Sequence, residues 1–123
     1  MKEEMLTVLK VEPGKPPEEV AMPNILEAMQ KMVGGFIEVV YLDDVCLVCN
    51  EEGKLIGLEG NRRVGDDIIA GTFFLAGATE DGEFCSLTRE QIDAYAEHFA
   101  HPEEFLPGEV EKNLRIEFYS FGG

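Results

Sequence analysis

Residues 34–76 read GGFIEVVYLDDVCLVCNEEGKLIGLEGNRRVGDDIIAGTFFLA, and this stretch indicates the architecture of the whole chain. Its apolar runs are short, rich in β-branched and aromatic residues, and separated by glycine and acidic residues, which is typical of strands joined by turns. One of its loops carries two adjacent arginines, Arg62 and Arg63. The sequence on either side predicts helices and further strands that cover this sheet.

Four strands are expected within the stretch, at residues 36–42, 45–50, 54–58 and 68–76. Glu51-Glu52-Gly53 is expected to close a hairpin, because glycine suits a position of positive φ. Residues 59–67 are polar and predict a loop. The last run has almost no polar alternation, which indicates a central strand covered on both faces, and Gly71 within it suggests a bulge or a close backbone approach.

Two helices are predicted from their end signals. Asn24 with Glu27 three residues later resembles a capping box, and Gly34-Gly35 ends that first helix. Thr88 with Gln91 forms a second box. An apolar stripe at helical spacing follows it: Ile92, Tyr95, Ala96 and Phe99.

Three further strands are expected outside this stretch and these helices. Residues 5–11 and 19–22 predict a first pair of strands around a proline-rich turn, and alternation at residues 110–121 predicts a last strand. The prediction is therefore one domain, residues 1–123, of the α+β class. Its mostly antiparallel sheet is expected to contain four to six of these strands, with two helices packed on it.

The composition is acidic, with 25 acidic and 10 basic residues and a net charge of −15. This balance opposes direct binding to nucleic acid, whose phosphates need lysine and arginine. It fits solubility through self-repulsion, and it also fits an acidic mimic of DNA, although the acids are spread along the chain. No apolar run suits a membrane span or a signal peptide, so a cytoplasmic protein without membrane contact is expected.

The three cysteines do not suggest a redox or metal site. Cys46 and Cys49 lie on a predicted strand, where side chains three apart point to opposite faces, and Cys85 stands alone. A pairing of Cys85 with His98 has no third group to orient it. We expect no catalytic residue, no metal site and no cofactor, and an enzyme is the least favoured class.

The best candidate site is a set of polar residues around the loop after Leu58. Residues 50–65 carry three acids and three bases, whereas residues 80–117 carry eleven acids and three bases, so cations are concentrated here. Arginine offers a planar fork of donors for phosphate or carboxylate, and asparagine amides orient a ligand. The predicted ligand-binding residues are Asn50, Lys54, Asn61, Arg62 and Arg63. The alternative is that the arginines pair with neighbouring carboxylates at the surface.

Several blocks of the sequence resemble a bacterial family, the domain of unknown function DUF3846. The blocks are VEPGKPPEE (11–19), ILEAMQKMVGGFIEVV (25–40), CNEEGKLIGLEGNR (49–62), DIIAGTFFLAG (67–77) and SLTREQIDAYAEHF (86–99), within residues 5–100. The resemblance implies a small phage or plasmid protein of Gram-positive bacteria, with no assigned activity. Such a mobile-element context suggests an accessory or counter-defence role.

Two functions are left open by the sequence. One is a non-enzymatic module that binds an anionic, nucleotide-like ligand through the five residues named above. The other is an acidic protein-interaction module or DNA mimic that inhibits a basic host protein which binds nucleic acid. The apolar C-terminal residues Phe118, Tyr119 and Phe121 also suggest an edge strand that could form a homo-oligomer.

Overall fold

The central sheet has the strand order β2-β1-β7-β4-β3, and every neighbouring pair is antiparallel. Its strands are β1 (Met5–Val11), β2 (Glu18–Pro23), β3 (Ile37–Tyr41), β4 (Val45–Asn50) and β7 (Phe73–Ala78), with the short β8 (Phe84–Cys85) paired to β7. The computed structural model describes residues 4–106 and 108–110 of the chain. The predicted α+β class with a mostly antiparallel sheet is confirmed.

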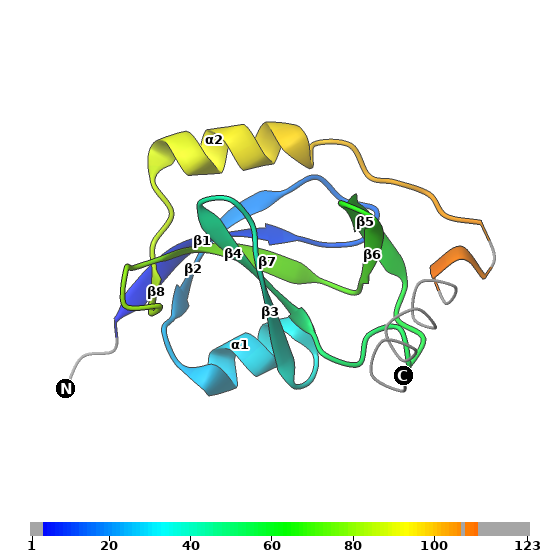
Figure 1. Ribbon diagram of the computed structural model, residues 1–123, viewed down its shortest axis with the longest axis horizontal. Coiled ribbons are helices and arrows are strands. Elements are labelled where there is room, and N and C mark those ends of the chain that lie inside the picture. Colours follow the sequence, from blue (N-terminus) through cyan, green and yellow to red (C-terminus); the bar gives the residue numbers. More distant parts are fainter. Residues whose placement is uncertain (1–3, 107, 111–123) are drawn as a thin grey trace.

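Helices cover both faces of this sheet. α1 (Leu26–Val33) lies against one face and α2 (Arg89–His98) against the other (Figure 1). Because side chains alternate along a strand, each central strand supplies both cores. In β4, Leu47 packs with the residues of α2, whereas its neighbour Val48 packs with those of α1. All six residues of β4 are therefore buried.

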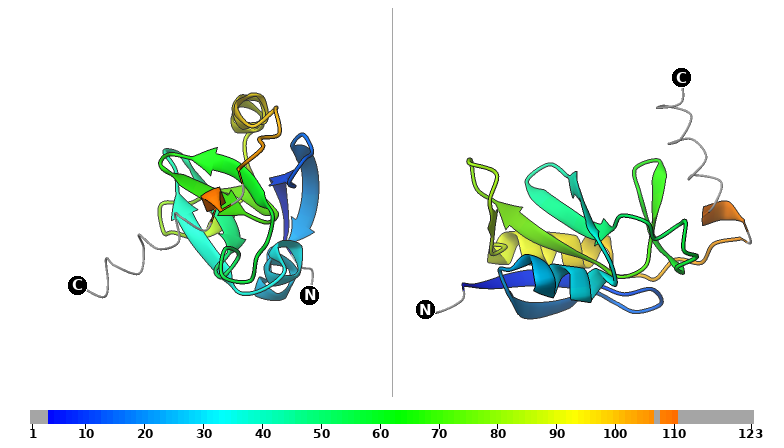
Figure 2. Two further views of the ribbon diagram at one scale, coloured as in Figure 1. Left: turned by 90° about the vertical axis from the view of Figure 1, so that its right-hand side faces the viewer. Right: turned by 90° about the horizontal axis from the view of Figure 1, so that it is seen from below.

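A separate two-stranded hairpin, β5 (Gly60–Val64) and β6 (Asp67–Ala70), lies at one end of the sheet (Figure 2). The prediction of a polar loop over residues 59–67 is therefore wrong. Polar residues on a strand look like loop residues in the sequence, but Asn61 and Arg62 are fully buried there with their polar groups bonded.

Two further strand predictions also need correction. Residues 51–57 form turns, so the expected strand over residues 54–58 is not present. The expected long strand over residues 68–76 is split into β6 and β7 at Gly71. Gly71 takes a φ of +85° and its N–H donates to Glu59 O at 2.8 Å, which turns the chain out of the hairpin and into the central sheet.

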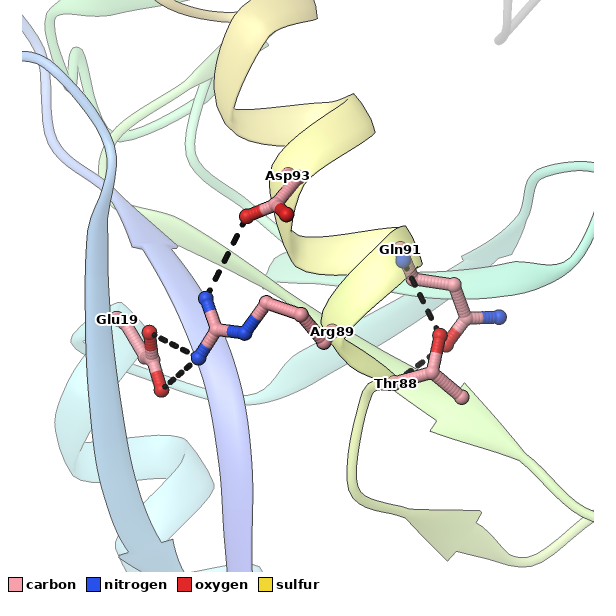
Figure 3. Close-up of polar contacts among 5 residues, drawn as sticks. All are labelled: Glu19, Thr88, Arg89, Gln91 and Asp93. Carbon is pink, nitrogen blue, oxygen red and sulfur yellow. Dashed lines mark hydrogen bonds and ion pairs between the residues drawn. The ribbon is translucent and has the colours of Figure 1, made fainter.

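The second predicted capping box is confirmed. Gln91 N donates to Thr88 Oγ1 at 3.1 Å, and Thr88 N donates to Gln91 Oε1 at 2.9 Å (Figure 3). In the same view Arg89 reaches from the first turn of α2 to both oxygens of Glu19 in β2, at 3.0 Å each. These contacts fix the start of α2 over the β1–β2 side of the sheet.

The first predicted capping box is wrong. The N-cap of α1 is Ile25, without a side-chain cap, and Asn24 Nδ2 donates instead to Glu4 Oε1 at 2.9 Å. The expected end of this helix is confirmed, because Gly34 takes the left-handed conformation with φ of 82°. The predicted strand at residues 110–121 lies, apart from Val110, outside the described residues.

The cysteines diverge as predicted. Cys49 packs in the core on the α2 face, whereas Cys46 is paired in register with Ala76, which packs in the core on the α1 face. All three cysteines are free thiols, and burial raises the pKa of Cys46 above its usual value. A buried, protonated thiol is a poor nucleophile.

Candidate functional site

The two adjacent arginines of β5 point to opposite sides of the hairpin. Arg62 has 0% of its surface exposed, whereas Arg63 is exposed. This divergence follows from the two-residue period of a strand, since neighbouring side chains leave opposite faces. The pair therefore does not act as one two-armed anion clamp.

Arg62 uses all five of its N–H donors inside the protein. Nε donates to Phe99 O at 3.2 Å, and Nη1 donates to the main-chain O and the Oδ1 of Asn61 at 3.2 and 2.8 Å. Nη2 donates to Lys15 O at 2.7 Å and to Phe99 O at 3.0 Å. The guanidinium thus ties β5 to the β1–β2 turn and to the end of α2, with no donor left for a ligand.

The charge of Arg62 is met by dipoles rather than by a bonded carboxylate. Phe99 is the C-cap of α2, so its carbonyl lies at the negative end of the helix dipole. Burial lowers the pKa of the Arg62 guanidinium, and the charge of Glu103 acts in the opposite direction. Arginine stays protonated in such surroundings because its ordinary pKa is so high.

Asn61 completes this buried polar group. Its Nδ2 donates to Val11 O and to Gly71 O, both at 2.8 Å, while its Oδ1 accepts from Arg62. The Asn61-Arg62 dipeptide therefore links β1, β5 and the turn before β7. These contacts give the pair a structural role that its position in the sequence did not suggest.

Arg63 pairs with acidic groups of the segment that follows α2. Its Nη2 donates to Glu109 Oε2 at 2.7 Å, and its guanidinium carbon lies 5.6 Å from the ring centre of Phe105. Its backbone N–H donates to Glu103 Oε2 at 3.1 Å. The hydrogen bond to Glu109 raises the pKa of Arg63. Arg63 therefore pairs with a neighbouring carboxylate at the surface, which was the alternative to ligand binding in the sequence analysis.

Asn50 and Lys54 lie elsewhere, at a cleft of about 460 Å³ between β3, the end of β4, the turn after it and β6. Lys54 forms an ion pair with Asp67 across this cleft. Asn50 Nδ2 donates to Val33 O at 3.2 Å, and Asn50 Oδ1 accepts from Glu52 N at 2.7 Å. Asn50 therefore joins the end of α1 to the turn.

The lining of this acidic cleft is dominated by carboxylates. Its charged residues are Glu38, Glu51, Glu52, Asp67 and Lys54, four acids against one base. Asn61, Arg62 and Arg63 are not among its lining residues. Of the five predicted ligand-binding residues, the structure thus brings two to the cleft and places three in or on the hairpin.

Exposed apolar side chains border the cleft. Phe36, Leu55 and Ile56 are 67%, 54% and 57% exposed. Leu55 lines the acidic cleft, while Phe36 and Ile56 line an adjoining hollow of about 270 Å³. Both hollows share Asn50 and Glu52. Apolar groups next to carboxylates form a surface of the kind that contacts another protein.

The sequence pattern does not predict the acidic cleft, because its carboxylates come from segments that are apart in the sequence. Glu51 and Glu52 lie in a predicted hairpin turn, and Glu38 lies within a predicted strand. One signal was present, since two apolar residues, Leu55 and Ile56, stand in a stretch that is otherwise polar and rich in glycine. Apolar side chains in a surface turn have little buried space to pack into, and these two are exposed.

The described part of the chain holds no helix that is long and apolar enough to cross a membrane. Within the same residues, no group of three or more His, Cys, Asp and Glu side chains is arranged to hold a metal ion.

Comparisons with known proteins place the chain in a family. Neither a search of curated proteins nor a search of solved structures found a match. The family model of a domain of unknown function, DUF3846, matches residues 5–100, which is most of the chain. The same span carries the blocks that suggested the resemblance, and it includes both helices and the whole sheet. The chain therefore belongs to the DUF3846 family.

Proposed function

We propose that this protein is a non-enzymatic interaction module that binds a basic partner protein through the acidic cleft and its apolar border. The cleft presents four carboxylates, and its one cation, Lys54, is already paired with Asp67. Exposed Phe36, Leu55 and Ile56 add apolar area beside these charges. Complementary charge raises the association rate and the selectivity of such a contact, and burial of apolar surface supplies much of its affinity.

The observation that carries this proposal is that most of the described lysine and arginine side chains already bind acceptors within the protein. The structure describes seven lysine and arginine side chains, and all except Lys31 hold an acceptor within the molecule. The six are Lys10, Lys15, Lys54, Arg62, Arg63 and Arg89. An anionic ligand would have to displace these contacts, whereas a basic partner meets a cleft with four acids and one base.

The partner class that fits best is a protein whose surface is shaped for nucleic acid. Such proteins gather lysine and arginine to neutralise phosphates, and an acidic face with the same spacing of charge competes for that surface. Carried on a phage or plasmid, a module of this kind would serve counter-defence by occupying a host protein.

The test compares two triple variants that remove the same charge from different places. Glu38→Gln/Glu51→Gln/Glu52→Gln removes three acids of the cleft, and Glu80→Gln/Asp81→Asn/Glu83→Gln removes three exposed acids of the β7–β8 turn. Binding of a purified core histone, as a basic probe, is measured by calorimetry at several salt concentrations. We expect a Kd that rises with salt, and an at least tenfold weaker Kd for the cleft variant only, about 1.4 kcal/mol.

Two outcomes contradict the proposal. Equal weakening in both triple variants means that the histone responds to net charge alone and not to the cleft. Tight binding of mono- or cyclic nucleotides by the wild-type chain, weakened by Arg63→Ala, means that the protein takes an anionic ligand instead. Arg63 is the suitable probe for this because its guanidinium is exposed, whereas Arg62 is enclosed.

A further inference from the structure

Strand β3 forms one edge of the central sheet and has a partner on one side only among the described residues. Phe36 O accepts from Glu51 N at 2.8 Å, and Leu42 N donates to Val45 O at 2.9 Å. Both residues therefore belong to hydrogen-bonded pairs with β4. Because such pairs alternate along an antiparallel ladder, the N–H and C=O groups of Ile37, Val39 and Tyr41 point away from β4.

These outward groups have no partner in the part of the chain that the structure describes. No hydrogen bond joins the N–H or C=O of Ile37, Val39 or Tyr41 to another described residue outside the β3–β4 ladder. A row of unpaired groups on an edge strand is a template for one more strand. Among the described residues, nothing therefore covers this edge along the length of β3.

The opposite edge of the sheet, β2, is less suited to pairing. It carries two charged residues at its start, Glu18 and Glu19, and ends in Pro23. Two further prolines, Pro16 and Pro17, precede it. Proline and charge are the usual protection of an edge strand. β3 has no proline and one charged residue, Glu38, and it therefore lacks this protection.

The charges beside the open edge identify the kind of occupant. Glu38 lies in β3 itself, Glu51 and Glu52 follow the paired strand, and Asp43 and Asp44 are exposed in the turn after β3. A second copy of the chain would bring the same acids against these, within a pair of molecules that each carry −15. A strand with lysine or arginine at alternate positions meets the acids instead.

Apolar side chains stand at both ends of the same edge. Phe36 precedes β3 and is 67% exposed, and Tyr41 ends it and is 69% exposed. In an extended segment with apolar residues between its cations, the apolar residues would lie on the face of Tyr41 and the cations on the face of Glu38. The edge therefore offers backbone, charged and apolar contacts to one segment of about seven residues.

We infer that an extended, lysine- or arginine-rich segment of the partner adds to the edge of β3 as a further strand, with one of its cations beside Glu38 in the acidic cleft. This inference rests on the proposed function and names the way in which the basic partner is held.

The test uses a heptapeptide of alternating lysine and valine, capped at both ends, and the full-length protein. Amide hydrogen exchange is followed by NMR with and without the peptide. Strand addition protects the outward amides of Ile37, Val39 and Tyr41, whereas those of Glu38 and Val40 are already bonded to β4. New protection at these three alternate amides is the expected result. Protection that is absent, or equal at all five residues, overturns the inference.

A matched pair of variants gives an independent measurement. Tyr41→Pro removes one outward N–H, and Tyr41→Ala keeps it, while both remove the same exposed ring. We expect the peptide Kd to be about tenfold weaker for Tyr41→Pro than for Tyr41→Ala, because a hydrogen bond is lost and the proline ring crowds the edge. Equal affinities overturn the inference.

The two proposals fail in distinguishable ways. If the cleft variant loses histone binding while Tyr41→Pro and hydrogen exchange show no strand addition, the interaction module stands and its strand mode is wrong. If neither histone nor peptide binds, both are wrong. A dimer of the wild-type chain that Tyr41→Pro dissociates would show that a second copy occupies the edge, which also overturns the inference.

Discussion

Arg62 is among the largest fully buried side chains of the protein, and its contacts are all to oxygen atoms of the chain itself. A buried cation is costly unless its donors are all used, and here they are. Removing the side chain leaves the carbonyls of Phe99 and Lys15 without their donors. Arg62 therefore stabilises the fold, because it joins three segments that come together only in the folded state.

Arg62→Met should lower the free energy of unfolding by about 3 kcal/mol, because buried carbonyls lose their partners. Urea unfolding followed by circular dichroism measures the change. Arg63→Met is the matched control, since it removes the same group and charge from an exposed position of the same strand. We expect the control to unfold at nearly the wild-type midpoint. Equal effects of the two changes would refute the structural role of Arg62.

At the scale of elements, α2 is held to the β3–β4 turn by a small polar group. Tyr95 Oη donates to Asp44 Oδ1 at 3.0 Å, and Gln91 Nε2 donates to Asp44 Oδ2 at 3.0 Å. The bonds from Gln91 and Tyr95 lower the pKa of Asp44. These hydrogen bonds therefore join the β3–β4 turn to the helix that packs over the sheet.

The same contact predicts a dependence of stability on alkaline pH. Burial, then the bond to Asp44, raises the pKa of Tyr95 to about 12. The unfolded value is about 10, so the contribution is fully present below about pH 10 and is lost as pH rises towards the folded value. Tyr95→Phe should flatten the fall in unfolding free energy over this range, measured by urea titration. Tyr41→Phe, at an exposed tyrosine, is the control and should retain the wild-type slope.

The turn that forms one wall of the acidic cleft depends on a close approach of two backbones. A Cβ at Gly53 would lie 2.8 Å from Ala70 O in β6. Gly53→Ala should therefore separate the turn from the hairpin and destabilise the protein by about 1–3 kcal/mol. Thermal unfolding measures this effect. Glu51→Ala, an exposed position in the same turn, should have a clearly smaller effect, and a reversed order would contradict the proposed packing.

At the scale of the whole molecule, the charge of −15 opposes the compact state. Salt screens this repulsion, so Tm should rise between about 10 mM and about 0.5 M NaCl. Scanning calorimetry at constant pH measures the rise. Glu80→Gln/Asp81→Asn/Glu83→Gln removes three exposed charges and should reduce the salt dependence. A Tm that falls with salt would mean that the protein's ion pairs outweigh its self-repulsion.

The local pattern of the chain was enough to predict the fold class and many of its elements. β1 and β4 lie where the β-branched runs are, and Thr88 with Gln91 starts α2 as the spacing predicts. These features depend on neighbours within a few residues, so the amino-acid order determines them directly. The wrong strand and loop predictions lie at residues 54–76, where the pattern was ambiguous between loop, hairpin and sheet, and the cap of α1 was also predicted wrongly.

By itself, the sequence determined the antiparallel sheet, the two helices, the separation of Cys46 from Cys49 and the acidic charge. Only the tertiary structure decided the place of Arg62, because its acceptors Phe99 and Lys15 stand 37 and 47 positions away along the chain. The same holds for the acidic cleft, whose carboxylates come from β3, a turn and β6. Long-range partners of this kind carry no local signal, and a buried charged side chain needs acceptors for its donors, which several segments supply together for Arg62.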